Sequence, residues 1–92
     1  MNKVFKVGLI GCGHISETYF RAQEYFNNIR IVKCADLNME IAKKCAIHYN
    51  IEAVTVEELL KDKEIEIILN LTIPSAHFEV SKMVLENGKH SY

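Results

Sequence analysis

The chain has 92 residues, of which 49% are hydrophobic and 25% charged, and its formal net charge is −1 at pH 7. This composition is ordinary for a globular domain and excludes a chain too polar to fold. The charge gives no electrostatic reason to expect nucleic acid or an anionic membrane as a partner. No apolar run approaches the ~20 residues of a membrane helix. No signal peptide is recognisable at the start of the sequence.

The first strand, turn and helix are predicted from the beginning of the chain. Val4 to Ile10 is rich in β-branched residues without clean alternation, which predicts a strand covered on both faces. After a glycine-containing turn, a helix that ends at Asn27 and Asn28 would have an inward face formed by Ile15, Tyr19, Ala22 and Phe26. Ile29 to Ala35 then predicts a second buried strand.

The middle of the chain contains two sets of helix signals. A helix over about Met39 to Tyr49 would be capped by Asn38, and its inward stripe would be formed by Ala42, Cys45, Ala46 and Tyr49. A short extended segment over residues 51–54 follows. Thr55 and Glu58 have the spacing of a capping box, which predicts a short helix through Leu59 and Leu60.

The strongest strand signal is the nearly unbroken apolar run from Ile65 to Ile73, which Pro74 would end. The last predicted helix runs from about Ala76 to Asn87, with Gly88 as its left-handed cap and an inward side of Val80, Met83, Val84 and Asn87. Residues 89–92 begin another extended segment. The alternation predicts an α/β fold with a parallel, doubly wound sheet and right-handed crossovers, truncated after the fourth helix.

The turn after the first strand has the sequence Gly11-Cys12-Gly13-His14-Ile15-Ser16. A helix N-terminus presents unpaired N–H groups and a partial positive charge, so it stabilises a pyrophosphate. Gly11 and Gly13 would allow the sharp turn and the close approach of that ligand. Ser16 departs from the Gly or Ala usual at the third position of G-x-G-x-x-G, but it is small.

Asp36 ends the second predicted strand, at the place where a carboxylate accepts hydrogen bonds from the adenosine ribose of a dinucleotide. Because the carboxylate would repel a 2′-phosphate, Asp36 favours NAD over NADP. Its alternative role is that of a helix-capping aspartate. S-adenosylmethionine-dependent methyltransferases and FAD proteins have a similar turn and remain alternatives.

The three cysteines, Cys12, Cys34 and Cys45, lie inside apolar stretches. Their odd number and the lack of a C-x-x-C pair argue against a disulfide framework, so we expect a cytoplasmic protein in a reducing environment. The simplest interpretation makes all three small buried hydrophobic residues. Cys12 and His14 alone would make a poor zinc site, and we expect no metal.

Several segments together resemble the N-terminal cofactor domain of the glucose–fructose oxidoreductase/inositol dehydrogenase (Gfo/Idh/MocA) family. The resemblance covers essentially the whole chain and depends on residues 7–16, 34–36, 55–60, 70–77 and 86–90. The most specific part is the P-x-x-H of Pro74 to His77, followed by a helix that closes in Gly88-Lys89-His90. Residues 1–92 would thus be the N-terminal part of a dinucleotide-binding domain.

The resemblance implies roles for individual residues. Gly11, Gly13, His14 and Ile15 would lie along the pyrophosphate, and Asp36 on the ribose. The cofactor would be lined beyond the fourth strand by Leu71, Thr72, Ile73 and Pro74, with His77 near the nicotinamide. Alternatively, Pro74 only ends the strand, Thr72 is a strand residue facing the cleft, and His77 is a helix cap or a packing residue. We expect a structural role for His90.

The family implies an NAD(P)-dependent oxidoreductase that acts on a sugar, cyclitol or related polyol bound by a second domain. The family's Glu-Lys-Pro segment, whose lysine lies near the reacting carbon, would follow Tyr92, so no catalytic residue is predicted here. We therefore expect this piece to bind NAD weakly or not at all, and not to catalyse. A stand-alone NAD-binding or sensing module is the alternative. An incomplete sheet would also leave an open edge and apolar helix faces, so we expect self-association, as in a homo-oligomer.

Overall fold

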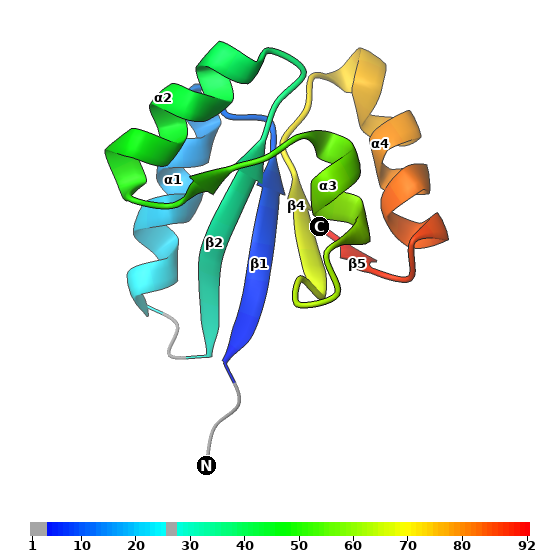
Figure 1. Cartoon of the computed structure of the whole chain (residues 1–92), viewed down its shortest axis with the longest axis horizontal. Coiled ribbons are helices and arrows are strands. Elements are labelled where there is room, and N and C mark those ends of the chain that lie inside the picture. Colours follow the sequence, from blue (N-terminus) through cyan, green and yellow to red (C-terminus); the bar gives the residue numbers. More distant parts are fainter. Residues whose placement is uncertain (1–3, 26–27) are drawn as a thin grey trace.

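A computed structural model of the chain describes residues 4–25 and 28–92, and strands and helices alternate in it (Figure 1). The elements are β1 (Phe5–Ile10), α1 (His14–Ala22), the short 3-10 helix η1 (Gln23–Tyr25), β2 (Ile29–Ala35), α2 (Met39–Tyr49), β3 (Glu52–Ala53), α3 (Val56–Lys61), β4 (Ile67–Asn70), α4 (Pro74–Glu86) and β5 (His90–Ser91). Among the described residues, no helix has the length and apolar character needed to cross a membrane.

The strands form one parallel sheet with the order β3-β2-β1-β4-β5. This order is that of the first five strands of the doubly wound dinucleotide-binding fold, which confirms the predicted fold class. The chain moves outward from β1 to β3 and then returns to the other side of β1 with β4. β1 and β4 therefore flank the point where the strand order reverses, and ligands bind beyond the carboxyl ends of such strands.

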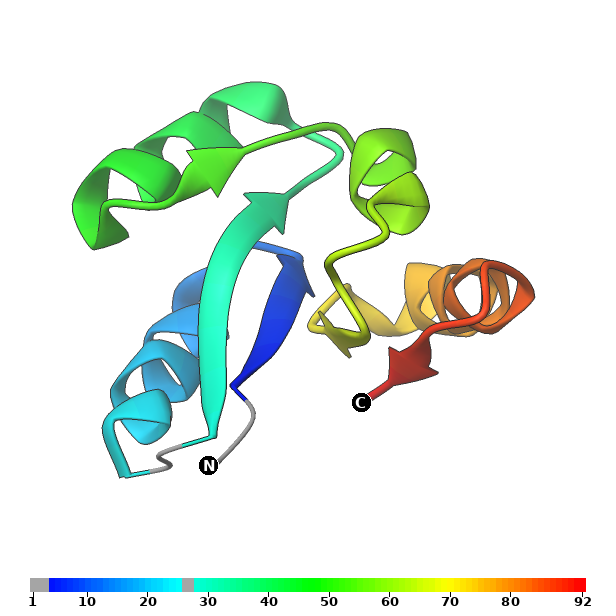
Figure 2. The ribbon, with the colours of Figure 1, turned by 60° about the horizontal axis from the view of Figure 1, so that its bottom comes forward.

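Helices lie on both faces of the sheet (Figure 2), and an apolar core fills the space between the sheet and the helices on each face. The core beneath α1 and α2 contains Val7, Leu9, Phe20, Ile31, Cys34, Cys45 and Ala46. The core beneath α3 and α4 contains Ile10, Ala35, Val54, Leu59, Leu60, Ile65, Ile68, Val80 and Val84. Because adjacent strand residues such as Leu9 and Ile10 enter opposite cores, the strands show no alternation of polar and apolar residues.

The predicted helix caps are present. The Asn38 side chain accepts a hydrogen bond from the backbone N–H of Glu40 at 3.0 Å, at the start of α2. Thr55 and Glu58 form the reciprocal capping box of α3. After α4, Gly88 has a φ of +73°, the left-handed conformation expected of a residue that ends a helix.

The fourth strand is shorter than the sequence predicts, and Pro74 has a different role. β4 ends at Asn70, and residues 71–73 form a loop in which Leu71 still donates a backbone hydrogen bond to Ile10 at 2.8 Å. Pro74 is the first residue of α4, two residues before the predicted start of that helix. A proline is well placed there because the first helical N–H has no intrahelical partner. The apolar run thus continues past the strand into a loop.

The inward face of α1 also differs from the prediction. Ser16 and Phe20 are 4% and 3% exposed, whereas Tyr19 is 37% exposed. The Phe20 ring stacks on Tyr49 of α2 with a centroid distance of 3.8 Å, so Phe20 takes the inward position expected for Tyr19. The periodicity alone does not separate two adjacent aromatic residues. The predicted contact of Phe26 and the helix end at Asn27 lie outside the described residues.

The inward side of α4 is narrower than predicted, and the segment after it has a structural explanation. Val80 and Val84 are buried, but Met83 is 39% exposed, and Asn87 is exposed. Lys89 is buried, and its amine donates hydrogen bonds to the backbone carbonyls of Asp62 and Ile65 at 2.5 and 2.6 Å. This contact anchors the loop before β4 to the start of β5.

Candidate functional site

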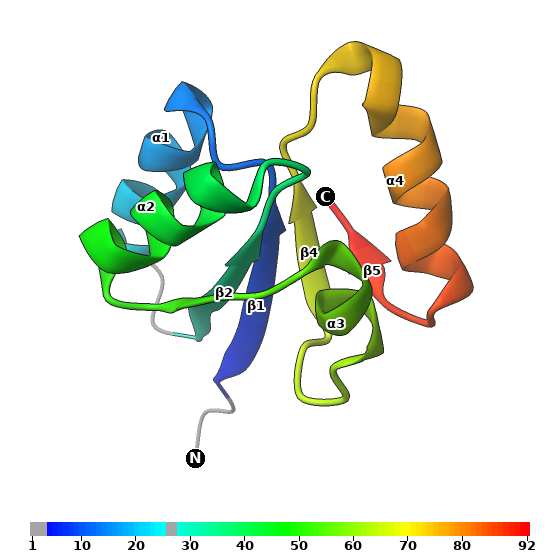
Figure 3. The same ribbon diagram turned by 45° about the horizontal axis from the view of Figure 1, so that its top comes forward.

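The carboxyl ends of β1 and β4 lie side by side where the strand order reverses (Figure 3). A pocket of about 240 Å³ lies at this place. It is lined by Ile10, Gly11, Gly13, Asp36, Leu37, Leu71, Thr72, Ile73 and Ala76. Most of the predicted cofactor-binding residues are thus brought together, from the turn after β1, the end of β2 and the loop after β4. Its location matches the ligand crevice of doubly wound sheets.

Gly11 is a glycine because of the fold. Its φ is +100°, a conformation that L side chains rarely adopt, and a Cβ there would lie 2.7 Å from the carbonyl carbon and oxygen of Leu71. Its backbone N–H donates to the carbonyl of Ala35 at 2.9 Å. The turn is therefore held between the end of β2 and the loop after β4, with no space for a side chain.

Gly13 is a glycine for a different reason. It is the N-cap of α1 with a φ of −79°, and a Cβ at this position would meet no atom within 4 Å. No described side chain caps this helix end, whereas Asn38 and Thr55 cap α2 and α3. The fold thus leaves open space directly at the N-terminus of α1. Such a place accommodates a phosphate, since backbone N–H groups and the helix dipole both favour an anion.

Ser16 fits the third position of the glycine motif. It is 4% exposed, and its hydroxyl donates a hydrogen bond to the Gly13 carbonyl at 2.6 Å. The small side chain thus lets α1 pack closely on the sheet, the role that glycine or alanine has in the strict motif.

Asp36 is held in a fixed orientation at the end of β2. One carboxylate oxygen accepts a hydrogen bond from the backbone N–H of Cys12 at 2.8 Å, and the other accepts from the N–H of Asn38 at 2.9 Å. Asp36 caps no helix, because Asn38 is the N-cap of α2. A carboxylate has about four acceptor positions. Asp36 can therefore still accept hydrogen bonds from hydroxyl groups of a ligand in the pocket.

The loop after β4 is held by Asn70, a residue that the sequence did not single out. Asn70 is 3% exposed, and its amide N–H₂ donates to the His77 carbonyl at 2.9 Å and to the Ser81 hydroxyl at 2.8 Å. Its amide oxygen accepts from the Thr72 hydroxyl at 2.5 Å and from the Thr72 backbone N–H at 3.2 Å. One buried side chain thus joins β4, the loop and α4.

The remaining predicted residues lie around this pocket. Pro74 and His77 are exposed in the first turn of α4, and neither belongs to the described residues that line the pocket. His77 is not a helix cap, because the N-cap is Ile73, whose carbonyl accepts the His77 backbone hydrogen bond at 3.0 Å. His14 and Ile15 form the first turn of α1, and their side chains lie outside what the structure describes.

Comparisons with known proteins agree with this geometry. The sequence model of the Gfo/Idh/MocA family, described as an oxidoreductase family with an NAD-binding Rossmann fold, matches residues 5–91. No curated protein sequence matches the chain significantly. Among solved structures, three that are similar to the chain are two dehydrogenases and a ketoreductase.

One of these structures is the UDP-N-acetylglucosamine 3-dehydrogenase of Acidithiobacillus ferrooxidans, with 25% identity and a TM-score of 0.80 over 94% of this chain. Another is the myo-inositol dehydrogenase of Lactobacillus casei in complex with NAD(H) and myo-inositol, with 23% identity and a TM-score of 0.84 over 96%. The third is a 3-ketoreductase of Actinomadura kijaniata in complex with NADP and TDP-benzene, with 23% identity and a TM-score of 0.87 over 97%.

The chain spans only 27% of the first two of these structures and 28% of the third. The family match, in contrast, covers nearly the whole chain and includes the glycine turn, Asp36 and the loop after β4. By this match, the chain belongs to the Gfo/Idh/MocA oxidoreductase family and forms its NAD-binding Rossmann fold.

Proposed function

We propose that the chain is the cofactor-binding part of an NAD-dependent oxidoreductase that transfers hydride to or from a sugar, cyclitol or related polyol. The observation that carries this proposal is the open space at Gly13, directly at the uncapped N-terminus of α1 and in the same pocket as Asp36. Similar structures support the substrate class, since they include complexes with myo-inositol and with a nucleotide-linked sugar.

The pocket suggests how a dinucleotide lies in it. The pyrophosphate would follow Gly11, Gly13 and the first turn of α1 at His14 and Ile15. The adenosine ribose would donate hydrogen bonds to Asp36. Toward the nicotinamide, the cofactor would pass the loop Leu71, Thr72 and Ile73 and reach the start of α4 at Pro74 and His77. When bound, NAD supplies the ring carbon that accepts or donates the hydride.

Asp36 supports NAD as the preferred cofactor. A 2′-phosphate on the ribose would place negative charge beside the Asp36 carboxylate. Two unit charges roughly 4 Å apart repel by ~4 kcal/mol at an effective dielectric constant of about 20, and solvent screening at this half-buried site lowers that figure. We expect a preference for NAD of at least about tenfold, which corresponds to ~1.4 kcal/mol. Similar structures contain NAD in some cases and NADP in others.

We also propose that this chain binds the cofactor and does not itself transfer protons. Among the described residues that line the pocket, Asp36 is the only titratable one, and both of its carboxylate oxygens already accept backbone hydrogen bonds. General acid–base catalysis needs a positioned group within hydrogen-bond reach of the reacting atom. Such a group, and the binding of the polyol, would come from other parts of a complete enzyme.

Calorimetric titration with NAD, NADP, S-adenosylmethionine and FAD tests the proposal. NAD should bind most tightly, and Asp36→Ala should weaken NAD binding by about tenfold, a loss of ~1.4 kcal/mol, while bringing the NAD and NADP affinities closer together. Glu57→Gln is the matched control, because Glu57 is an exposed acidic residue in the first turn of α3, outside the pocket. Tighter binding of S-adenosylmethionine or FAD than of NAD would contradict the proposal.

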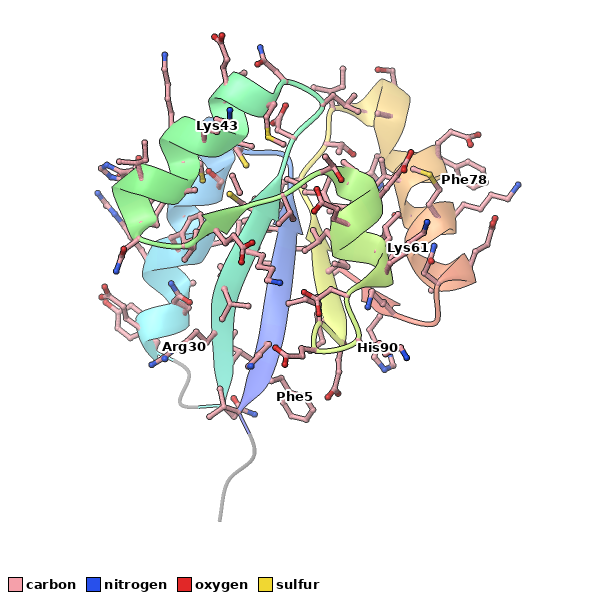
Figure 4. The ribbon with its side chains drawn as sticks, viewed as in Figure 1. Phe5, Arg30, Lys43, Lys61, Phe78 and His90 are labelled. Carbon is pink, nitrogen blue, oxygen red and sulfur yellow. The ribbon has the colours of Figure 1, made fainter. Side chains whose placement is uncertain are left out.

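Self-association is the second part of the proposed function. β5 lies at one edge of the sheet, and Phe78 of the neighbouring α4 points outward (Figure 4). Phe78 and Leu85 of this helix are 73% and 63% exposed. Edge strands and exposed apolar groups favour pairing with another chain. We expect sedimentation equilibrium to show a mass above that of the monomer at high concentration, and Phe78→Glu to lower it. A monomer at every concentration would contradict this part.

A further inference from the structure

The fold brings together the three cysteines, which are far apart in the sequence. Cys12 lies in the turn after β1, Cys34 lies near the end of β2, and Cys45 is on the inward side of α2. Their three sulfur atoms lie within 4.8 Å of one another. Figure 4 shows sulfur atoms close together where α2 passes over α1 and the sheet. The sequence predicts three separate buried hydrophobic residues, but the structure makes them neighbours in one thiol cluster, Cys12, Cys34 and Cys45.

The spacing of the thiol cluster is close to that of a three-sulfur metal site. Three sulfur atoms arranged around one ion at a metal–sulfur distance of about 2.3 Å are roughly 4.0 Å apart. The sulfur atoms here are separated by at most 4.8 Å. Shifts of under about 1 Å, which small side-chain rotations provide, would therefore bring all three into contact with one ion.

The donor set selects the kind of ion. Thiolate sulfur is a soft ligand that favours Cu(I) and Zn²⁺ over Mg²⁺ or Ca²⁺. A structural zinc site takes four protein ligands, whereas the group found among the described residues offers three and contains no histidine or carboxylate. The three sulfur atoms therefore match an ion that is coordinated by two or three sulfur ligands better than they match Zn²⁺. Cu(I) is the physiological ion of this kind.

Each of the three thiols must lose its proton before its sulfur binds a metal ion. Hydrogen bonding with Cys34, together with burial, raises the pKa of Cys12, and burial raises the pKa of Cys45 to about 11. The Cys12 thiol donates to the backbone carbonyl of Ala35 at 3.5 Å and the Cys34 thiol to that of Ala42 at 3.4 Å, so both sulfurs carry protons before an ion binds. On binding, the S–H bond of each thiol breaks, its proton leaves to solvent, and the resulting thiolate forms a metal–sulfur bond, with no electron transferred.

A solvent route reaches the thiol cluster. An open cleft of about 810 Å³ between α1 and α2 is lined by Cys12 and Cys45, together with Gly13, Ser16, Glu17, Ile41, Lys44, His48 and Tyr49. Its lining shares Gly13 with the dinucleotide pocket but includes neither Asp36 nor the loop after β4. An ion could thus reach the sulfur atoms without passing through the dinucleotide pocket.

We propose that Cys12, Cys34 and Cys45 form a binding site for one soft, thiophilic metal ion, with Cu(I) as the best-matched ion. The proposal does not rest on the proposed oxidoreductase activity, although Cys12 lies between Gly11 and Gly13 in the turn beside the dinucleotide pocket. It stands on the mutual distance of three sulfur atoms from three elements, on the lack of hard ligands in the group, and on the cleft that leads to two of the sulfurs.

Anaerobic competition between the fully reduced protein and a chromophoric Cu(I) chelator tests this site. One Cu(I) per chain should be retained, and X-ray absorption should show a first coordination shell of sulfur. Cys12→Ala is the first variant, because Cys12 is half-buried in a turn and its loss should leave the fold intact. It should weaken binding by more than roughly 100-fold, since losing residues that only orient metal ligands already costs roughly 10- to 100-fold.

His48→Ala is the matched control, because His48 lines the same cleft and is a common type of metal ligand, yet lies outside the three-sulfur group. The affinity of the His48→Ala protein for Cu(I) should stay within about threefold of that of the wild type, a difference of under ~0.7 kcal/mol. Binding that is unchanged by Cys12→Ala, or lost in His48→Ala, would overturn the proposal. Cys34 is fully buried, so a second measurement uses the intact chain with Cd²⁺: absence of thiolate-to-metal charge-transfer absorption would equally overturn it.

Discussion

The two sides of the dinucleotide pocket are built by opposite means. On one side, the turn after β1 depends on missing side chains, because Gly11 has no room for a Cβ and Gly13 leaves open space at the start of α1. On the other side, the loop after β4 depends on one side chain, the buried amide of Asn70 with its contacts to Thr72, His77 and Ser81. Backbone groups can thus be made accessible to a ligand in two ways: by residues that have no side chain, or by a buried side chain that holds the loop in place through hydrogen bonds.

In the turn after β1, the two glycines lack a side chain for two different reasons. Gly11 contacts the Leu71 backbone, so it joins the two sides of the pocket, while the Cβ position of Gly13 is free. The motif therefore combines a glycine that the fold needs with one that only a ligand would need. Substitutions should separate these roles.

The largest effect is expected for Gly11→Ala. The positive φ costs about 1–3 kcal/mol, and the 2.7 Å approach to the Leu71 carbonyl forces the loop after β4 to move. We expect the free energy of unfolding in urea to fall by about 3–5 kcal/mol, with loss of NAD binding. Unchanged stability would show that the turn and the loop are not in the contact described.

Gly13→Ala is the matched substitution on the same turn. Since the added Cβ meets no protein atom within 4 Å and φ is −79°, the free energy of unfolding should change by less than about 1 kcal/mol. NAD affinity, measured by calorimetry, should nevertheless fall by more than about tenfold, or ~1.4 kcal/mol. Equal NAD affinity in this variant and the wild type would remove the pyrophosphate from this position.

Asn70→Ala tests the side-chain half of the comparison. It removes a buried amide with contacts to three residues and leaves the Ser81 hydroxyl and the Thr72 backbone N–H without this partner. Net contributions of about 0.5–1.5 kcal/mol per hydrogen bond predict a loss of about 2–3 kcal/mol in the free energy of unfolding. Asn87→Ala is the control: Asn87 is exposed, donates to the Met83 carbonyl, and should cost less than about 0.5 kcal/mol. Equal costs for the two would refute the role of Asn70.

The smallest effect is expected for an ion pair outside both sides of the pocket. The Lys33 amine donates to Asp62 at 2.5 Å, and this hydrogen bond lowers the pKa of Asp62. Its contribution to stability is therefore present above the unfolded-state pKa of about 3.9 and is lost as pH falls below that value. Asp62→Asn should cost about 1 kcal/mol at pH 7 and flatten the pH dependence of unfolding between about pH 4 and 2.

The more exposed pair of Lys6 and Glu64, with an N–O distance of 3.0 Å, gives the matched comparison. Glu64→Gln should change the free energy of unfolding at pH 7 by less than about 0.5 kcal/mol. Urea unfolding of both variants across this pH range is the measurement. If the free energy of unfolding fell more steeply with decreasing pH in Asp62→Asn than in the wild type, the stabilising role of the Lys33–Asp62 pair would be contradicted.

The elements and the glycine side of the pocket were predictable from the sequence because their signals are local. Strand and helix alternation, the caps at Asn38 and Thr55, and the pair Gly11 and Asp36 all rest on nearby residues or on a motif of known spacing. The strand before Pro74 was predicted too long, because apolar residues that line a pocket look like strand residues. Asn70 and the thiol cluster could not be predicted, because their partners come from separate elements.

The most direct test of the account is the set of backbone amide shifts that change when NAD is added to ¹⁵N-labelled protein. If the dinucleotide lies at the reversal point of the sheet, the largest changes should come from three separate segments: residues 11–16, residues 36 and 37, and residues 71–73. Changes confined to the cleft between α1 and α2, at Lys44, Cys45 and His48, or the absence of any saturable change, would contradict the proposed site.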